Sequence, residues 1–190
     1  MIKIFKPCDF HVHLREGELA KQVLAENNKH FQKILIMPNL NIPITNSKLL
    51  NKYRNHLLKN NKNLEILFTI YLNQNCSIRE LSEMNKKKLF FSVKLYPQNA
   101  TTNSSSGVSD IKKMTNFFEF LEKNEVPLCV HGEHIKFNDD PFEREKKFLD
   151  IELNWIRKNF PNLKITLEHI TTKDSVDFVK QHNLIGATVT

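Results

Sequence analysis

Four histidines stand at the ends of apolar segments, in positions that suit metal binding. His11 and His13 are two residues apart, so both side chains point to the same face of an extended strand. His131 and His169 each end a further apolar run. A single His-x-His pair also occurs as two ordinary polar residues at a strand end, but imidazole is a common zinc ligand. If the three strands are parallel, their carboxyl ends bring all four imidazoles together, which predicts a metal site.

Lys94 is the charged residue within the apolar segment Phe90–Pro97. A lysine in a buried strand must pair, reach solvent or lose its charge, because desolvation lowers the pKa of an ammonium group. A neutral amine can form a Schiff base or take up CO₂ as a carbamate. The carbamate would replace a cation by an anionic ligand with two oxygens, which can bridge two metal ions.

Short β-branched and aromatic runs alternate with longer amphipathic segments, a pattern typical of βα units around a parallel sheet. The strands repeat about every 30 residues, a spacing shared by (β/α)₈ barrels and doubly wound sheets. No G-x-G-x-x-G motif follows the first strand, which argues against a dinucleotide-binding sheet. The seven predicted strands are Ile4–His13, Lys33–Asn39, Leu64–Leu72, Leu89–Tyr96, Pro127–Glu133, Lys164–His169 and Leu184–Thr190.

Helix start signals stand between several of these strands. Ser77 and Glu80 form a capping box, Asp140 precedes a proline suited to a first helical turn, and Thr172 belongs to a weaker signal. After Asp140, apolar residues at i, i+4, i+7 and i+11 predict one helix with a single buried face. These residues are Leu149, Leu153, Ile156 and Phe160.

The composition of the 190-residue chain indicates one globular domain of modest size. Its 28 Lys and Arg exceed its 21 Asp and Glu, giving a net charge of +7, but the basic residues are spread in short groups. Since no nucleic-acid-binding motif accompanies them, they predict solvated helix faces and no nucleic-acid partner. No apolar stretch is long enough to span a membrane and no secretion signal is recognisable, so we expect a cytoplasmic protein without membrane contact.

The cysteines and the other histidines predict no further site. Cys8, Cys76 and Cys129 lie in or beside apolar runs without C-x-x-C spacing, which predicts buried, reduced thiols. The other four histidines are expected on helices or loops, as surface or structural residues. They are His30, His56, His134 and His182.

Five sequence blocks resemble the dihydroorotase family of the amidohydrolase superfamily, in its bacterial single-function type. The blocks are HVHLREG, MPNL, VKLYPQNATTNSSSG, VHGE and LEHITTKD, and the similarity extends from Asp9 to Thr190. The resemblance implies a zinc-dependent enzyme of pyrimidine biosynthesis that reversibly cyclises N-carbamoyl-L-aspartate to (S)-dihydroorotate. It also implies an α/β fold, the (β/α)₈ TIM barrel of the amidohydrolase type.

The resemblance implies a binuclear zinc centre. His11 and His13 would bind one zinc ion, and His131 and His169 would bind the second. Lys94, carboxylated to N6-carboxylysine, would bridge the two ions. A hydroxide held between the metals would be the nucleophile toward the ring carbonyl, since two Lewis acids lower the pKa of a shared water.

The resemblance also implies the substrate-binding residues. Arg15 and Asn39 match family residues that hold the substrate carboxylate, although Arg15 could also form a surface ion pair with a neighbouring glutamate. Thr101 and Thr102 match a mobile loop that closes over the substrate. The full implied set is His13, Arg15, Asn39, Thr101, Thr102 and His131.

One family residue has no counterpart in the chain. The family needs an aspartate after an eighth strand, which ligates a metal and carries the proton to the leaving nitrogen. We expect this residue beyond Thr190, so the chain holds no predicted general acid or base and should be poorly active alone. We therefore predict that residues 1–190 form one metal-dependent amidohydrolase barrel domain, C-terminally truncated, with about seven strands and the eighth missing.

Two other functions fit the same residues. The protein could be an inactive metal-binding or partner-binding scaffold, or it could hydrolyse another cyclic amide. The pairing of Arg15 and Asn39 with the polar loop 99–107 favours a small substrate that carries a carboxylate, and hence dihydroorotate over a plain hydantoin. Since family members are commonly dimers, a homodimer is the expected assembly.

Overall fold

The computed structural model describes residues 5–59, 61, 63–136 and 140–189. In this part of the chain, seven strands form one sheet whose spatial order follows the sequence order from β1 to β7. Every neighbouring pair of strands is parallel. The strands are β1 (Cys8–Val12), β2 (Lys33–Ile36), β3 (Glu65–Leu72), β4 (Ser92–Leu95), β5 (Leu128–His131), β6 (Ile165–Glu168) and β7 (Ile185–Ala187).

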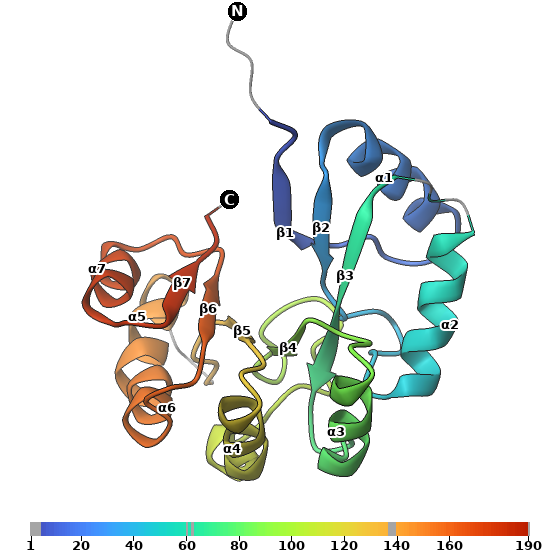
Figure 1. Ribbon diagram of the computed structural model, residues 1–190. Coiled ribbons are helices and arrows are strands. Elements are labelled where there is room, and N and C mark those ends of the chain that lie inside the picture. Colours follow the sequence, from blue (N-terminus) through green and yellow to red (C-terminus); the bar gives the residue numbers. More distant parts are fainter. Residues whose placement is uncertain (1–4, 60, 62, 137–139, 190) are drawn as a thin grey trace, which may run out of the picture.

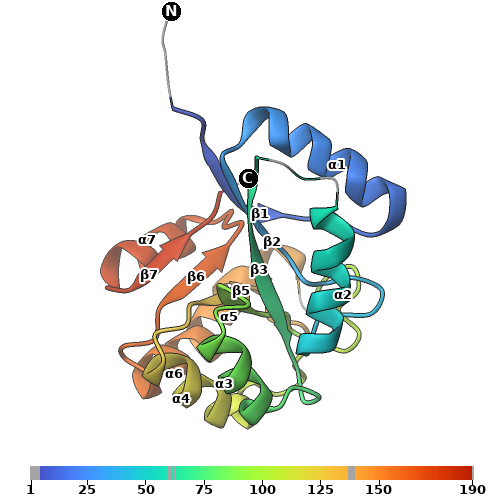
Figure 2. The same cartoon turned by 45° about the vertical axis from the view of Figure 1, so that its right-hand side comes forward.

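Helical segments connect successive strands and lie around the outside of the curved sheet (Figures 1 and 2). None of the described helices is long and apolar enough to cross a membrane. The α-helices are α1 (Gly17–His30), α2 (Ser47–Leu58), α3 (Ile78–Lys86), α4 (Thr115–Lys123), α5 (Arg144–Phe148), α6 (Asn154–Asn159) and α7 (Lys173–Gln181). Shorter segments are the 3-10 turns η1 (Ile111–Met114) and η2 (Pro141–Glu143) and the π-helical η3 (Leu149–Leu153).

The sheet has the architecture of an incomplete α/β barrel, as predicted. β1 and β7 are its end strands, and within the described residues they do not pair with each other. Figure 1 shows the sheet curving from β1 through β4 to β7, with the open part of the curve between the two end strands. The carboxyl ends of all seven strands therefore face one end of this open barrel.

All seven predicted strands are present, and each is shorter than predicted. Ile4 and Thr190, the predicted outer limits of the first and last strands, lie outside the described residues. All strands except β3, which ends at Leu72 as predicted, also end earlier than predicted, because residues at their carboxyl ends leave the extended conformation. His169, for example, follows β6 with a φ of 44° and turns the chain out of the sheet.

The two faces of the sheet carry different side chains, because successive residues of a strand alternate between faces. Val93 and Leu95 of β4 pack into the large core between sheet and helices. Lys94 lies between them and therefore points to the inner face of the curved sheet. Its register partner on β5, Cys129, belongs to a separate, smaller apolar cluster on that face.

The helix signals predicted the right positions, and one of the predicted helices contains turns of more than one type. Ser77 and Thr172 cap α3 and α7, each accepting a backbone N–H as predicted. The single helix predicted after Asp140 is one uninterrupted helical segment, in which η2, α5, η3 and α6 follow one another directly. The predicted apolar stripe, from Leu149 to Phe160, is buried as predicted. The π-helical turn accommodates it with a wider backbone hydrogen-bond spacing than an α-helix has.

The cysteine prediction needs one correction. Cys8 is exposed rather than buried, because it begins an end strand of the sheet. Cys76 and Cys129 are buried as predicted, and all three thiols are free. His134 is a buried structural histidine whose Nδ1 lies 2.6 Å from Glu152 Oε1 on η3.

Candidate functional site

The structure brings the four candidate histidines together at the carboxyl ends of three strands. His11 lies in β1 and His13 follows it, while His131 ends β5 and His169 directly follows β6. The ring centroid of His11 lies 5.1 Å from that of His13 and 5.2 Å from that of His169. His131 and His169 are 4.7 Å apart. The four imidazoles thus form one continuous cluster, although their residues come from opposite ends of the chain.

The rings of this cluster contact one another edge to face, and their nitrogens do not all converge on one point. Within the described residues, no three His, Cys, Asp or Glu side chains are already arranged as metal ligands. His11 directs its Nδ1 at Glu168. His131 Nε2 lies 3.4 Å from Glu133 Oε1, without the geometry of a hydrogen bond.

Lys94 is completely buried beneath this cluster. Its Nζ lies 5.0 Å above the centroid of the Tyr96 ring and has no hydrogen-bond partner in the described part of the chain. Burial lowers the pKa of Lys94, and the negative charge of Glu168 partly opposes this effect. A buried amine whose pKa is lowered is a candidate for reaction with CO₂, because only the neutral amine is nucleophilic.

The environment keeps two of the imidazoles neutral. Burial, together with the nearby charges of His11 and Arg15, lowers the pKa of His13 to about 3. Burial and the charge of Lys94 lower the pKa of His169 to about 4. A neutral imidazole keeps a lone pair on one nitrogen, which is the form that binds a metal ion.

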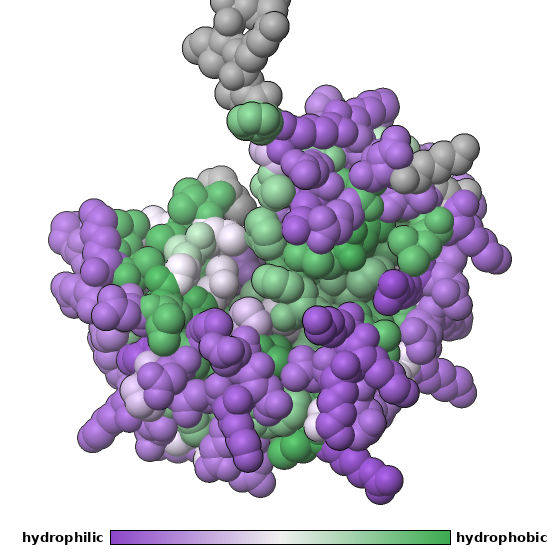
Figure 3. Space-filling model, viewed as in Figure 1, coloured by the Kyte–Doolittle hydropathy of each residue, from purple (hydrophilic) through white to green (hydrophobic). Residues whose placement is uncertain are grey.

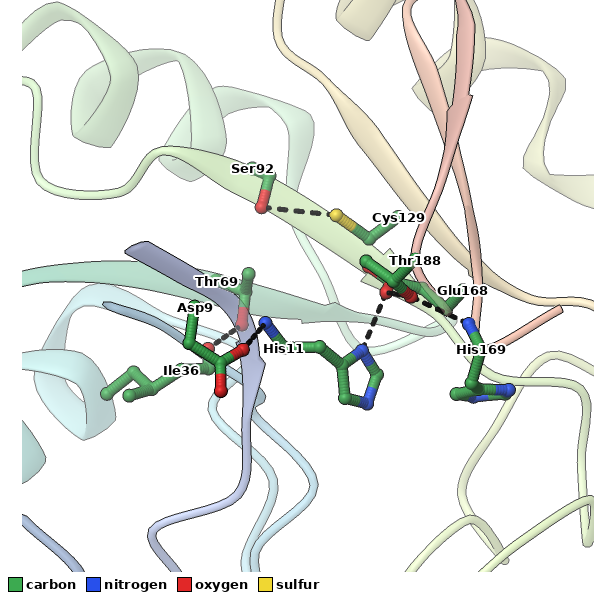
Figure 4. Close-up of polar contacts among 9 residues, drawn as sticks. All are labelled: Asp9, His11, Ile36, Thr69, Ser92, Cys129, Glu168, His169 and Thr188. Atoms are coloured by element: carbon green, nitrogen blue, oxygen red, sulfur yellow. Dashed lines mark hydrogen bonds and ion pairs between the residues drawn. The ribbon is translucent and has the colours of Figure 1, made fainter. Parts of the chain in front are cut away.

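Glu168 joins the cluster although the sequence analysis did not select it. Figure 4 shows its carboxylate between the His11 ring and the Thr188 hydroxyl. Burial alone would raise the pKa of Glu168, but the hydrogen bond from His11 and the charge of Lys94 outweigh it and lower the pKa to about 2. An acidic residue that closes an apolar strand directly before His169 was the available sequence signal.

Two of the predicted carboxylate-binding residues lie beside the histidines. Arg15 has a φ of 63°, and its carbonyl oxygen accepts a hydrogen bond of 2.7 Å from the Tyr53 hydroxyl. Its Nη1 is buried without a hydrogen-bond partner among the residues described. Asn39 is buried, and its polar contact with His13 partly offsets the fall in the pKa of that histidine.

The loop that contains Thr101 and Thr102 already contacts Asn39. Asn39 Nδ2 donates to the Thr102 carbonyl at 3.0 Å, and Asn103 Nδ2 donates to the Asn39 carbonyl at 3.1 Å. The Thr101 and Thr102 side chains are exposed. The loop therefore lies over the side of the cluster next to β2, held by two amide hydrogen bonds.

A cavity of about 880 Å³ lies beside the cluster, at the ends of β4 and β5. Its walls include Asn99, Glu133, Arg144 and Trp155, and none of the predicted site residues is among the described residues that line it. We nevertheless locate the candidate site at the histidines. They lie on the inner face of an open sheet, which lacks the walls that would enclose a cavity there.

The sequence is similar to curated dihydroorotases along its whole length, while no protein-family model matches it. It is 45% identical over 194 residues to the dihydroorotase of Buchnera aphidicola subsp. Acyrthosiphon pisum (strain APS), covering 100% of this chain and 55% of the relative. It is 41% identical over 192 residues to the dihydroorotase of Sinorhizobium medicae, covering 98% and 55% of the two proteins. The chain thus spans about half the length of the curated relatives it matches.

Solved structures give the same result for the fold. A dihydroorotase from Campylobacter jejuni superimposes with a TM-score of 0.88 at 35% identity, over 97% of this chain and 54% of that one. The Saccharomyces cerevisiae dihydroorotase in complex with 5-fluoroorotic acid gives a TM-score of 0.90 at 29% identity, over 97% and 55%. An L-hydantoinase from Arthrobacter aurescens, at 13% identity and a TM-score of 0.78, shares the fold alone. By sequence and by fold, the chain is a homologue of the N-terminal part of the dihydroorotases.

Proposed function

We propose that the chain supplies the metal centre and part of the substrate site of a dihydroorotase. The proposed reaction is the zinc-dependent, reversible cyclisation of N-carbamoyl-L-aspartate to (S)-dihydroorotate in pyrimidine biosynthesis. The observation that carries the proposal is the meeting of four imidazoles with the fully buried Lys94 at the carboxyl ends of parallel strands. Residues 1–190 would form one metal-dependent amidohydrolase barrel domain of that protein.

The residues of the cluster fit a pair of zinc ions. Zinc prefers imidazole nitrogen and carboxylate oxygen ligands. His11 and His13 would hold one ion and His131 and His169 the other, with Lys94 as N6-carboxylysine between them. Lys94 Nζ and His131 Nε2 support this fit, because both are buried without hydrogen-bond partners among the described residues. Buried polar atoms without partners are rare in folded proteins unless a ligand completes the site.

When bound, the two ions would supply Lewis acidity that activates a water and polarises the substrate carbonyl. The residues of the chain would prepare the site for this chemistry. Burial keeps His13 and His169 neutral, with pKa values of about 3 and about 4, so they need not lose a proton to act as ligands at neutral pH. Lys94 itself is fully buried and therefore shielded from bulk water.

Arg15 and Asn39 would hold the carboxylate of the substrate, assisted by Thr101 and Thr102 of the loop. Arg15 carries an unpaired, buried Nη1 in the described structure, and a guanidinium group donates two parallel hydrogen bonds to a carboxylate. The yeast relative was solved with 5-fluoroorotic acid, a pyrimidine ring with one carboxylate. His13 and His131, beside Arg15 and Tyr96 respectively, would face the same substrate.

The proposal is tested by assaying the full-length protein with dihydroorotate and with N-carbamoyl-L-aspartate, in parallel with its zinc content. We expect turnover in both directions and about two zinc ions per chain. The Lys94→Ala variant should lose bound metal and most of its activity, because its side chain can no longer bridge two ions. Normal metal content and turnover in this variant would contradict the proposal.

The same assay separates the two alternative functions. Zinc binding without turnover of either substrate would indicate an inactive metal-binding scaffold. Hydrolysis of a plain hydantoin in preference to dihydroorotate would indicate another cyclic-amide hydrolase. A cytoplasmic homodimer remains part of the proposal, and sedimentation of the full-length protein measures its assembly.

A further inference from the structure

We propose that Glu168 is a positioning residue of the candidate metal centre: its carboxylate, anchored by Thr188, holds His11 in the tautomer that leaves Nε2 able to bind a metal ion. This inference rests on the proposed function, because it requires His11 to be a metal ligand. It adds two residues to the site: Glu168, the last residue of β6, directly before His169, and Thr188, which follows β7.

The contact between Glu168 and His11 is short and shielded from solvent. Glu168 Oε2 lies 2.6 Å from His11 Nδ1, and the exposed fraction of the Glu168 side chain is 0%. The two residues are 157 positions apart and belong to strands on opposite sides of the open part of the sheet (Figures 1 and 4). A buried carboxylate placed on one nitrogen of a distant imidazole restricts both the position and the rotation of that ring.

The chemistry of the pair fixes the tautomer of His11. An ionised carboxylate only accepts hydrogen bonds, so Nδ1 of His11 must carry the proton that Glu168 accepts. Nε2 of a neutral imidazole then carries the lone pair. A carboxylate that accepts the second N–H of a histidine ligand orients the ring and makes its other nitrogen more basic.

Thr188 holds this carboxylate through its hydroxyl group. Its Oγ1 donates to Glu168 Oε2 at 2.6 Å and accepts the backbone N–H of His169 at 2.6 Å. The backbone of Thr188 is itself fixed, since its N–H donates to the Leu167 carbonyl and its carbonyl accepts from Ile170. A residue after β7 therefore anchors the carboxylate that orients one candidate ligand and the backbone of another.

The hydrogen bond between the His169 N–H and the Thr188 hydroxyl explains the unusual backbone of His169. Its φ of 44° lies in the left-handed region, which few residues other than glycine adopt. The hydrogen bond from its N–H to Thr188 stabilises that conformation, and the conformation turns the His169 ring toward His11 and His131. Thr188 thus connects the geometry of His169 with that of His11.

A purely electrostatic role for Glu168, as the counter-charge of Lys94, explains these contacts less well. Lys94 Nζ has no hydrogen-bond partner in the described residues, so the carboxylate does not pair with it directly. Both hydrogen bonds of Glu168 Oε2 instead come from His11 and Thr188. The direction of these bonds favours the positioning of His11 as the main role.

The inference is tested with Glu168→Gln in the full-length protein. The amide keeps the size of the side chain but removes the negatively charged carboxylate that accepts the hydrogen bond from His11 Nδ1–H. We expect zinc affinity, measured by competition with a chromophoric chelator, to fall by about 10- to 100-fold. In the metal-free protein, the ¹⁵N spectrum of the His11 ring should change from a single Nδ1–H tautomer to a mixture of tautomers.

Glu145→Gln is the matched control. Glu145 also accepts hydrogen bonds, from the backbone and hydroxyl groups of Thr171 and Thr172, but it anchors the start of α7 and does not contact His11. We expect it to lower the melting temperature without changing zinc affinity or the His11 spectrum. Equal zinc affinity and an unchanged His11 spectrum in Glu168→Gln and the parent would overturn the inference.

Two further variants cover the case in which Glu168→Gln does not fold. Thr188→Val removes the hydroxyl that anchors Glu168 and should weaken zinc binding several-fold, whereas Thr188→Ser should restore it. Parent-like zinc affinity in Thr188→Val would contradict the inference. If the parent itself binds no zinc, the proposed function fails, and the ring spectrum of His11 still decides whether Glu168 fixes its tautomer.

Discussion

Arg15 combines a strained backbone with an unsatisfied side chain, and both features point toward ligand binding. Its positive φ of 63° costs conformational energy that the Tyr53 hydrogen bond helps to offset. Its Nη1 lacks a partner within the described structure although it is buried. Strain and missing hydrogen bonds of this kind concentrate where a substrate completes the structure.

Arg15→Lys should therefore raise KM for dihydroorotate by about 10- to 100-fold, because lysine keeps the charge but cannot donate two parallel hydrogen bonds to a carboxylate. Steady-state kinetics on the full-length protein measures the effect. Arg54→Lys is the matched control, since Arg54 packs over the Phe68 ring away from the histidines. A hydantoin without a carboxylate should show no change in KM with Arg15→Lys, and an equal increase for both substrates would argue against carboxylate recognition.

The two neutral histidines make the metal-free protein sensitive to mild acid. In the unfolded chain both imidazoles have a pKa near 6.5, whereas in the fold the pKa falls to about 3 for His13 and about 4 for His169. The unfolded state therefore binds more protons below pH 6.5. Stability must then decrease as the pH falls from about 6.5 toward 4.

Urea unfolding of the chelator-treated protein at pH 7, 6 and 5 measures this dependence. The slope should stay below about 1.4 kcal/mol per pH unit for each histidine, because both rings are partly exposed and therefore screened. His169→Asn should flatten the slope, while His30→Asn, an exposed change on α1, should leave it as in the parent. Glu168 does not contribute to the pH dependence measured between pH 7 and 5, since its lowered pKa of about 2 affects stability only below about pH 4.5. A slope unchanged by His169→Asn would contradict the assignment.

At the scale of elements, the loop 99–107 depends on a close approach that only glycine permits. A Cβ on Gly107 would lie 2.6 Å from the Tyr96 carbonyl oxygen and 2.9 Å from that of Ser104, and backbone atoms cannot move aside cheaply. The N–H of Val108 donates to the same Tyr96 carbonyl at 2.8 Å. Gly107 therefore fastens the loop to the end of β4, directly beyond Lys94.

Gly107→Ala should displace the loop and weaken the contacts of Thr102 and Asn103 with Asn39. We expect a several-fold or greater rise in KM for dihydroorotate together with normal zinc content, because the histidines lie on other elements. Steady-state kinetics of the full-length variant measures the rise in KM, and metal analysis measures its zinc content. Gly186→Ala is the matched control, since its Cβ would meet no atom within 4 Å. Loss of zinc from Gly107→Ala would show that the loop also supports the metal centre.

The elements also show what the sequence could and could not predict. All seven strands were predictable because buried parallel strands appear as apolar runs, and the position of His131 and His169 at their ends followed from the parallel order. The contact of the buried Glu168 with His11 was not predictable, because the two residues are 157 positions apart and no local sequence pattern connects them. The π-helical turn η3 was also missed, since its apolar stripe fits an α-helix equally well.

At the scale of the whole molecule, the open side of the sheet is the dominant feature. β1 and β7 are paired on one side only in the described residues, and unpaired strand edges favour association with other chains. Figure 3 shows hydrophobic residues on both flanks of the hollow between the two sides of the sheet. The exposed fraction is 41% for Phe10 on β1 and 76% for Val189 after β7. Apolar surface therefore accompanies both free edges.

The 190-residue chain, produced alone, should consequently self-associate through this open side. Sedimentation velocity over a range of concentrations should show a rising sedimentation coefficient, because each molecule can pair its free edges with another. Val189→Lys places a charge beside the β7 edge and should shift the association to higher concentration. Leu19→Lys is the matched control, since Leu19 is 52% exposed and belongs to α1, a helix that lies far from β7 in both ribbon views. Equal effects of the two substitutions would mean that general surface charge, and not the open edge, governs association.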